Sequence, residues 1–145
     1  MKPIITVFFL SSAFLGASAE ASEVVEVKSI YWSDADSGRI NGSLKFRLNS
    51  VDAPETGGVG AAIGGAKCEK ERELGFEAKE WIVGFTKEKA LEVSKGYGED
   101  RYGRLIIDLS SGGVDVGREG VSEGHLRVWP HEGSKSLAPK PRWCS

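Results

Sequence analysis

Histidine, cysteine and methionine are scarce in this sequence. Its 145 residues include two histidines, two cysteines and one methionine. Two cysteines need histidines to complete a tetrahedral zinc site, and His125 and His131 lack the usual ligand spacing. The sequence therefore gives no indication of a metal site built on sulfur.

An excess of positive charge is also missing. The chain has 19 lysines and arginines against 21 aspartates and glutamates, a formal net charge of −2. Proteins that bind nucleic acids usually have a basic face. Because this chain is not basic as a whole, any affinity for phosphate must come from a bound metal and a few focused cations, for which the candidates are Lys45, Arg47, Arg101 and Arg104.

Apolar runs of the roughly 18 residues that a membrane-spanning helix needs are absent. The most apolar segment lies within residues 4–15, follows Lys2 and precedes the small-x-small pattern of residues 17–19. This order is typical of a secretory signal peptide over residues 1–19, with cleavage after Ala19 or, as the alternative, after Ala21. A membrane anchor is the other interpretation, against which the shortness of the segment argues. We expect a secreted or periplasmic protein with no membrane segment after cleavage, whose net charge changes from −2 to −3 because Lys2 is lost.

The expected export determines how the two cysteines are interpreted. An exported chain can oxidise its thiols, so Cys68 and Cys144 are expected to form a disulfide that ties the tail to a helix. The alternative is a pair of free thiols, one buried and one in the tail.

Length and hydrophobic content predict one α+β domain over residues 23–131, followed by an extended tail over residues 132–145. Period-two patterns predict strands at residues 23–32, 39–40, 44–51, 91–97, 104–110 and 126–129. The Asn41-Gly42 pair predicts a hairpin turn. Apolar residues recur every three and four positions from Cys68 to Lys87, which predicts a long amphipathic helix, and residues 114–123 suggest a short second one.

The segment Arg47–Thr56, with the sequence RLNSVDAPET, is the most informative in the chain. It contains a cation, two carboxylates and a rigid turn where a strand pattern ends. Proline fixes its own φ and restricts the residue before it, so the Ala53 carbonyl and the Asp52 and Glu55 side chains are held in a defined loop. An arginine beside two hard oxygen ligands suits a phosphate ester and a divalent metal.

Two further motifs strengthen the interpretation of the first. Residues 34–38 read DADSG and residues 100–104 read DRYGR. From about Val25 to Trp129, the ordered set D-x-D-S, R-L-x-x-V-D-x-P-E-T and D-R-Y-G-R resembles the staphylococcal nuclease (thermonuclease) family. The resemblance implies a five-stranded OB-fold β-barrel with one long helix and one or two short helices packed on it.

The resemblance also implies a Ca²⁺ site. Its ligands would be the carboxylates of Asp36 and Asp52 and the carbonyl of Ala53, where the family often has threonine. Oxygen ligands of this kind are those that calcium prefers. Asp36 is alternatively a turn residue that bonds its own backbone. An EF-hand loop starting at Asp34 is excluded, because its twelfth position is Lys45 and not glutamate.

By the same resemblance, Arg47, Glu55 and Arg104 are the catalytic residues. Glu55 would position or deprotonate the attacking water, and the two arginines would grip the phosphate with their planar guanidinium groups. The alternatives are a loop-capping role for Glu55 and structural ion pairs for the arginines. Tyr102 and Arg101 would contact the substrate. The family's tyrosines near the carboxy-terminal end are replaced by residues 129–131, Trp-Pro-His.

These residues together predict a secreted, calcium-dependent nuclease that hydrolyses DNA and RNA with little sequence preference, and we expect it to be a monomer. The resemblance implies products with 3′-phosphate ends. One alternative is a non-catalytic OB-fold module that binds nucleic acid, oligosaccharide or a protein, which the acidic net charge favours. Another is a calcium-stabilised structural domain.

Overall fold

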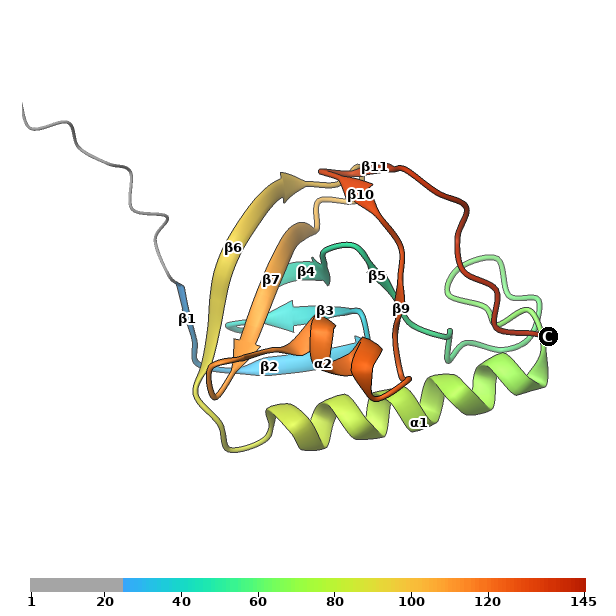
Figure 1. Ribbon diagram of the computed structural model, residues 1–145, viewed down its shortest axis with the longest axis horizontal. Coiled ribbons are helices and arrows are strands. Elements are labelled where there is room, and N and C mark those ends of the chain that lie inside the picture. The colour runs from blue at the N-terminus through green and yellow to red at the C-terminus, as the bar shows by residue number, and fades with distance from the viewer. Residues whose placement is uncertain (1–24) are drawn as a thin grey trace, which may run out of the picture.

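The computed structural model describes residues 25–145 and consists of one curled sheet with a long helix across it (Figure 1). The predicted signal peptide, residues 1–19, lies outside the described residues. The strands of the sheet are β1 (Val25–Val27), β2 (Ile30–Asp34), β3 (Ser37–Ile40), β4 (Leu44–Leu48), β6 (Leu91–Glu99), β7 (Leu105–Ser111) and β8 (Val114–Asp115). The helices are α1 (Glu69–Thr86) and α2 (Val116–Ser122). Two short pairs complete the fold: β5 (Val51–Asp52) with β9 (Arg127–Val128), and β10 (His131–Glu132) with β11 (Lys135–Ser136).

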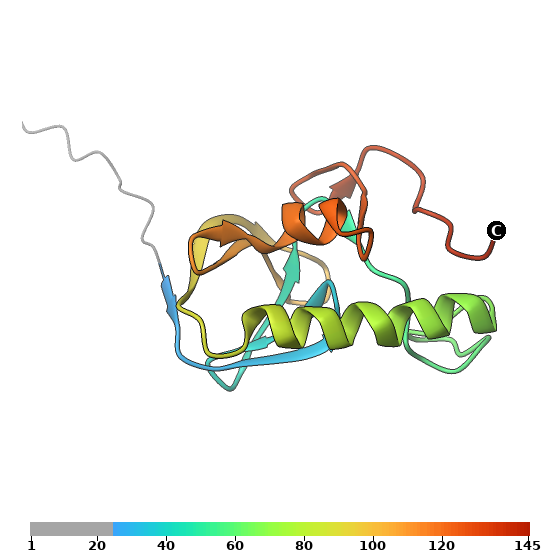
Figure 2. The same ribbon diagram turned by 60° about the horizontal axis from the view of Figure 1, so that its bottom comes forward.

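The strand order in the sheet is β1-β6-β7-β4-β3-β2, with β8 paired to β7. Neighbours are antiparallel except β4 and β7, which are parallel. The sheet curls into a half-barrel, and α1 lies along the side formed by β2 (Figure 2). The predicted α+β class is confirmed, and the half-barrel is consistent with an OB-like barrel. Neither helix in the described part of the chain is long and apolar enough to cross a membrane.

Local sequence explains the hairpin between β3 and β4. Asn41 and Gly42 have φ angles of 50° and 85°, left-handed values that this residue pair tolerates, and with Ser43 they form the three-residue loop between the strands. The Asn41 side chain also accepts a hydrogen bond of 2.7 Å from the backbone N–H of Lys28. The predicted hairpin turn is therefore present, and it fixes the register in which Ile40 faces Leu44.

The predicted strand over residues 44–51 is wrong beyond Leu48. Residues 49 and 50 form a turn in which Ser50 has a φ of 55°. This turn separates β4 from β5, so Val51 and Asp52 leave the main sheet and pair with Val128 and Arg127 of β9. The break matters for function because it directs Asp52 away from the sheet and toward the turn between β2 and β3.

The helix predicted from Cys68 to Lys87 is present as α1. Its inward face carries Ala78 and Ile82, which are fully buried. Near its end, Thr86 donates a hydrogen bond of 2.7 Å to the carbonyl of Ile82 and accepts one of 3.0 Å from the indole of Trp32. The core beneath it is formed by large apolar side chains of the sheet, including Trp32, Ile40, Phe46, Leu48 and Leu109.

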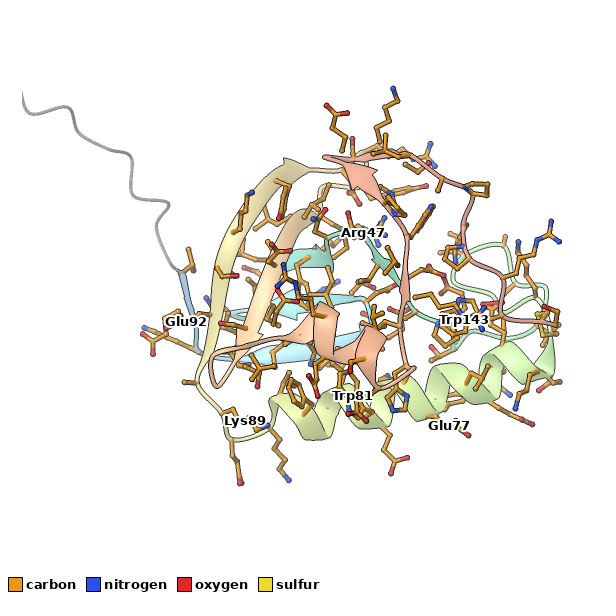
Figure 3. The ribbon with its side chains drawn as sticks, in the orientation of Figure 1. Arg47, Glu77, Trp81, Lys89, Glu92 and Trp143 are labelled. Carbon is orange, nitrogen blue, oxygen red and sulfur yellow. A yellow bond between two sulfur atoms is a disulfide. The ribbon has the colours of Figure 1, made fainter. Side chains whose placement is uncertain are left out.

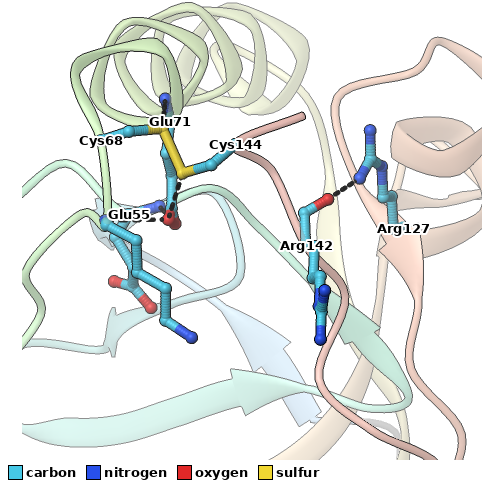
Figure 4. The surroundings of a disulfide bond; sticks show 7 residues. Glu55, Cys68, Glu71, Arg127, Arg142 and Cys144 are labelled. Atoms are coloured by element: carbon cyan, nitrogen blue, oxygen red, sulfur yellow. Dashed lines mark hydrogen bonds between the residues drawn. A yellow bond between two sulfur atoms is a disulfide. The ribbon is translucent and has the colours of Figure 1, made fainter.

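The tail expected to be extended forms the β10–β11 hairpin and then returns across the molecule. Its last residues end beside the start of α1, where a disulfide joins Cys68 to Cys144 with a Cα–Cα distance of 6.0 Å (Figure 4). Trp143 is buried, with 5% of its surface exposed. The tail is thus part of the packed domain.

Removing this disulfide is expected to lower the free energy of unfolding by about 2–4 kcal/mol, because the bond closes a long loop and restricts the unfolded chain. The measurement is urea unfolding of the Cys68→Ser/Cys144→Ser double variant against the oxidised parent protein. An equal free energy of unfolding in the two proteins would show that the bond contributes nothing to stability.

Candidate functional site

Four carboxylates from two separate segments of the chain lie close together. Asp34 ends β2, Asp36 lies in the turn before β3, Asp52 ends β5, and Glu55 follows Pro54. Asp36 Oδ2 accepts a hydrogen bond of 2.9 Å from the backbone N–H of Ala53, which joins the two segments. Asp34 is close enough to Asp36 and Glu55 for both groups to affect its pKa. We call Asp34, Asp36, Asp52 and Glu55 the carboxylate cluster.

Helix α1 supports the loop that carries Glu55. A Cβ atom at Gly75 would lie 2.6 Å from the carbonyl oxygen of Glu55 and 2.9 Å from that of Pro54, so only glycine permits this close approach. The buried Glu71 side chain accepts hydrogen bonds from the backbone N–H groups of Glu55, at 3.2 Å, and Lys67, at 3.1 Å. Sequence reasoning missed both supporting residues. The available signal was Gly75 itself, an unfavourable residue in the middle of a strong helix pattern.

Ionisation of the carboxylate cluster is electrostatically unfavourable without a nearby cation. Burial and the adjacent charge of Asp34 raise the pKa of Asp36 to about 7. Burial is also the main reason that the pKa values of Asp34, Asp52 and Glu55 are raised. Neighbouring like charges and loss of water both disfavour ionised carboxylates. A bound positive charge would relieve this cost.

The cation next to the cluster is Lys140, which no sequence pattern had indicated. Its Nζ lies 2.8 Å from Asp52 Oδ1 and 3.8 Å from Glu55 Oε1. The indole N–H of Trp143 donates a hydrogen bond of 2.9 Å to Asp52 Oδ2. Both carboxylate oxygens of Asp52 are therefore bonded to groups of the carboxy-terminal segment. Although burial opposes it, the contact with Asp52 raises the pKa of Lys140.

Arg47 is the second positive charge near the cluster. Its charge lowers the cost of ionising Asp36, although burial and Asp34 dominate the pKa of that group. The guanidinium lies 5.3 Å from the centroid of the Trp129 ring, beside β9 (Figure 3). Its one hydrogen bond in the described chain is a long one of 3.4 Å to the Val51 carbonyl. Most of its donors are thus free of protein acceptors, as a phosphate-binding group requires.

The predicted residues of the β6–β7 turn form a group of their own. Arg104 Nε lies 2.7 Å from Asp100 Oδ2, and Asp100 Oδ1 also accepts from the Tyr102 and Arg104 N–H groups at 2.9 and 3.0 Å. The Arg101 guanidinium donates a hydrogen bond of 2.7 Å to the hydroxyl of Tyr102, a residue that is 61% exposed. Arg104 is therefore paired with Asp100, and not with any member of the carboxylate cluster.

The predicted calcium ligands have suitable chemistry, but Asp52 is already occupied by other groups. Carboxylate oxygens at Asp36 and Asp52, with Glu55 and Asp34 nearby, have the hard-donor chemistry that calcium prefers. Lys140 and Trp143, however, already use both oxygens of Asp52. Within residues 25–145, no three His, Cys, Asp or Glu side chains are arranged closely enough to hold a metal ion. The donor types fit calcium, but Lys140 must leave Asp52 before they can enclose it.

No protein-family model matches this chain, and no curated protein is significantly similar to it.

Replacing Asp36 by asparagine is expected to stabilise the metal-free protein by about 1 kcal/mol or more at pH 8. The pKa of Asp36 is raised to about 7, so the folded state retains a proton that the unfolded state has lost, and stability falls as pH rises from about 4 to about 7. Asparagine keeps an acceptor for the Ala53 N–H and removes the charge. Urea unfolding in chelator at pH 8 measures the effect.

The matched control is Asp100→Asn. Bonds from Arg104 outweigh the effect of burial and lower the pKa of Asp100, so this substitution should destabilise the protein. Destabilisation by both substitutions would contradict the assignment of Asp36 as a strained carboxylate.

Proposed function

We propose that this protein is an exported, calcium-dependent nuclease that hydrolyses phosphodiester bonds of DNA and RNA with little sequence preference. The observation that carries the proposal is the carboxylate cluster, which brings together residues of two of the three thermonuclease-like motifs and has Arg47 beside it. The raised pKa values within the cluster support a cation site, because a cation is what such a group of charges favours.

Each of the candidate catalytic residues has a defined role in the proposed reaction. Glu55, whose side chain is 23% exposed, accepts a proton from the attacking water. Arg47 and Arg104 donate hydrogen bonds to the phosphoryl oxygens, and Arg104 does so through the guanidinium N–H groups that its Nε bond to Asp100 leaves free. The carboxylates of Asp36 and Asp52 and the carbonyl of Ala53 would hold Ca²⁺, which would supply positive charge for the phosphoryl oxygens.

The bond broken in this reaction is that between phosphorus and the 5′ oxygen. The water oxygen forms a new bond to phosphorus, and the 5′ oxygen leaves with a proton, so the products have 3′-phosphate and 5′-hydroxyl ends. Tyr102 and Arg101 offer an exposed aromatic face and a cation beside it, which suits stacking on bases of any kind.

The finer architecture belongs to the same proposal. We assign a five-stranded OB-fold barrel to β2, β3, β4, β6 and β7, for which the curled sheet and the helix α1 along its β2 side are the support. The protein is proposed to act as a monomer in the periplasm or outside the cell.

A non-catalytic OB-fold module that binds nucleic acid or another ligand is the second candidate. The observation in its favour is Lys140, which already neutralises Asp52 without a metal. The net charge of −2 points the same way.

The experiment that separates the two candidates is cleavage of single-stranded DNA and RNA by the exported, purified protein, with calcium and with chelator. The nuclease produces calcium-dependent fragments whose 5′ ends are labelled by a kinase without prior phosphatase treatment. A binding module shifts the migration of the nucleic acid and leaves it intact, and that result would replace the nuclease proposal.

A further inference from the structure

The segment of residues 137–145, here called the C-terminal strap, lies directly on the carboxylate cluster. It brings Lys140 and Trp143 to Asp52 from 88 and 91 positions away in the sequence. The ammonium group of Lys140 is also 3.8 Å from Glu55, so it lies between the two carboxylates that the nuclease needs for cation binding and water activation. The strap therefore places a positive charge of the protein on Asp52, one of the proposed calcium ligands.

Several contacts hold the strap in this position. The Trp129 indole donates a hydrogen bond of 2.8 Å to the carbonyl of Ala138. Arg127 lies over the Trp143 ring, 4.1 Å from its centroid, and donates to the carbonyl of Arg142 (Figure 4). Beyond Trp143, the disulfide to Cys68 attaches the strap covalently to the start of α1 (Figure 4). The strap is thus fixed on both sides of Lys140.

We propose that the C-terminal strap is an autoinhibitory lock, in which Lys140 lies beside Glu55 and competes with a divalent cation for Asp52, and the Cys68–Cys144 disulfide keeps the strap closed. This inference rests on the proposed function, since it assigns a regulator to the same site. An ammonium group and a calcium ion cannot both bind Asp52 Oδ1, because they would occupy the same space and repel each other.

The disulfide strengthens the competition through effective concentration. A tethered group meets its site at a concentration set by the length and stiffness of the tether, so shortening the free segment favours the bound state. With the bond closed, residues 137–143 are held between the β10–β11 hairpin and Cys144. With it open, the strap ends in a free terminus and depends on its noncovalent contacts alone.

A dithiol reductant opens the lock by exchange. One thiolate of the reductant attacks one sulfur of the Cys68–Cys144 bond, which forms a mixed disulfide and releases the other cysteine as a thiolate. The second thiolate of the reductant then bonds to the first sulfur of the reductant and releases the attacked cysteine. The reductant becomes a disulfide, and the two cysteines receive its two electrons and two hydrogens as thiols. Cys144 is exposed and Cys68 is half-buried, so the bond is accessible from solvent.

The test is calcium affinity, measured by isothermal titration calorimetry on the full exported protein in four forms. These are the oxidised parent, the Cys68→Ser/Cys144→Ser double variant, Lys140→Met with the disulfide intact, and Lys135→Met as the matched control. Lys135 is an exposed lysine of β11 with no ion pair in the described chain, so its loss tests the effect of net charge alone.

The lock predicts that Lys140→Met binds calcium at least about tenfold more tightly than the parent, that the double serine variant gains in the same direction, and that Lys135→Met does not. Lys140→Met keeps the disulfide, so its result is independent of any loss of stability in the double variant. Equal affinity in Lys140→Met and the parent overturns the lock and leaves the proposed function standing. No binding by any form overturns the lock and the calcium site together. A gain in Lys140→Met without one in a folded double serine variant overturns the redox control.

Discussion

Replacing Glu55 by glutamine is expected to lower the turnover of nucleic-acid cleavage by about 10²–10⁴-fold. Glu55 is more open to water than Asp52, because 23% of the Glu55 side chain is exposed against 2% of the Asp52 side chain. Glutamine has nearly the same shape but cannot accept a proton at neutral pH. The measurement is the rate of cleavage of a single-stranded DNA at saturating calcium.

The fold should survive this change. The backbone N–H of Glu55 bonds to Glu71, and the approach of its carbonyl to α1 depends on Gly75, so neither contact involves the altered side chain. A melting temperature close to that of the parent is the required control. Undiminished turnover in Glu55→Gln would show that another group activates the water.

Replacing Arg104 by alanine is expected to lower kcat by about 10²–10³-fold, because a preorganised donor to the charged phosphoryl oxygens is lost. Arg104 is held by Asp100 at 2.7 Å, and this pairing aims the guanidinium before substrate arrives. Arg104→Lys keeps the charge but loses the planar pair of donors, so it should restore only part of the activity. Steady-state kinetics on single-stranded DNA measures both variants.

The neighbouring Arg101→Ala is the matched control for Arg104. Arg101 is exposed, and in the described chain its side-chain hydrogen bond and cation–π contact are both with Tyr102, so its loss should raise KM more than it lowers kcat. If Arg101→Ala and Arg104→Ala reduced kcat equally, the effect would belong to the positive charge of the turn and not to a specific contact with phosphate.

Most of the fold was predictable because its signals are local. The alternating pattern of β6 and β7, the helical period of α1 and the Asn41-Gly42 turn depend on residues close together in the sequence. The break at Ser50 was not predictable in the same way, since serine rarely adopts a positive φ and the contacts that hold this turn come from distant residues. The Ser50 carbonyl accepts a hydrogen bond of 2.9 Å from the Trp129 N–H, and its hydroxyl oxygen accepts one of 3.1 Å from the His131 N–H.

The residues of the candidate site likewise divide into those that local motifs indicate and those that distant contacts bring to the site. Asp36, Asp52 and Glu55 were identified by short motifs, and the structure brings these residues together. Lys140 and Trp143 were missed, because a lysine or tryptophan in a polar tail has no local pattern that indicates a distant carboxylate. Their contacts span up to 91 positions and follow from the path of the tail and its attachment at Cys68.

The most direct test of the account is the cleavage of single-stranded DNA by the purified protein and by Glu55→Gln, prepared in parallel and assayed over a calcium titration. We predict calcium-dependent cleavage by the parent, abolished by chelator, and at least about a hundredfold less by Glu55→Gln. Equal cleavage by the two preparations, or none by the folded parent at any calcium concentration, would contradict the assignment of the carboxylate cluster as a nuclease site.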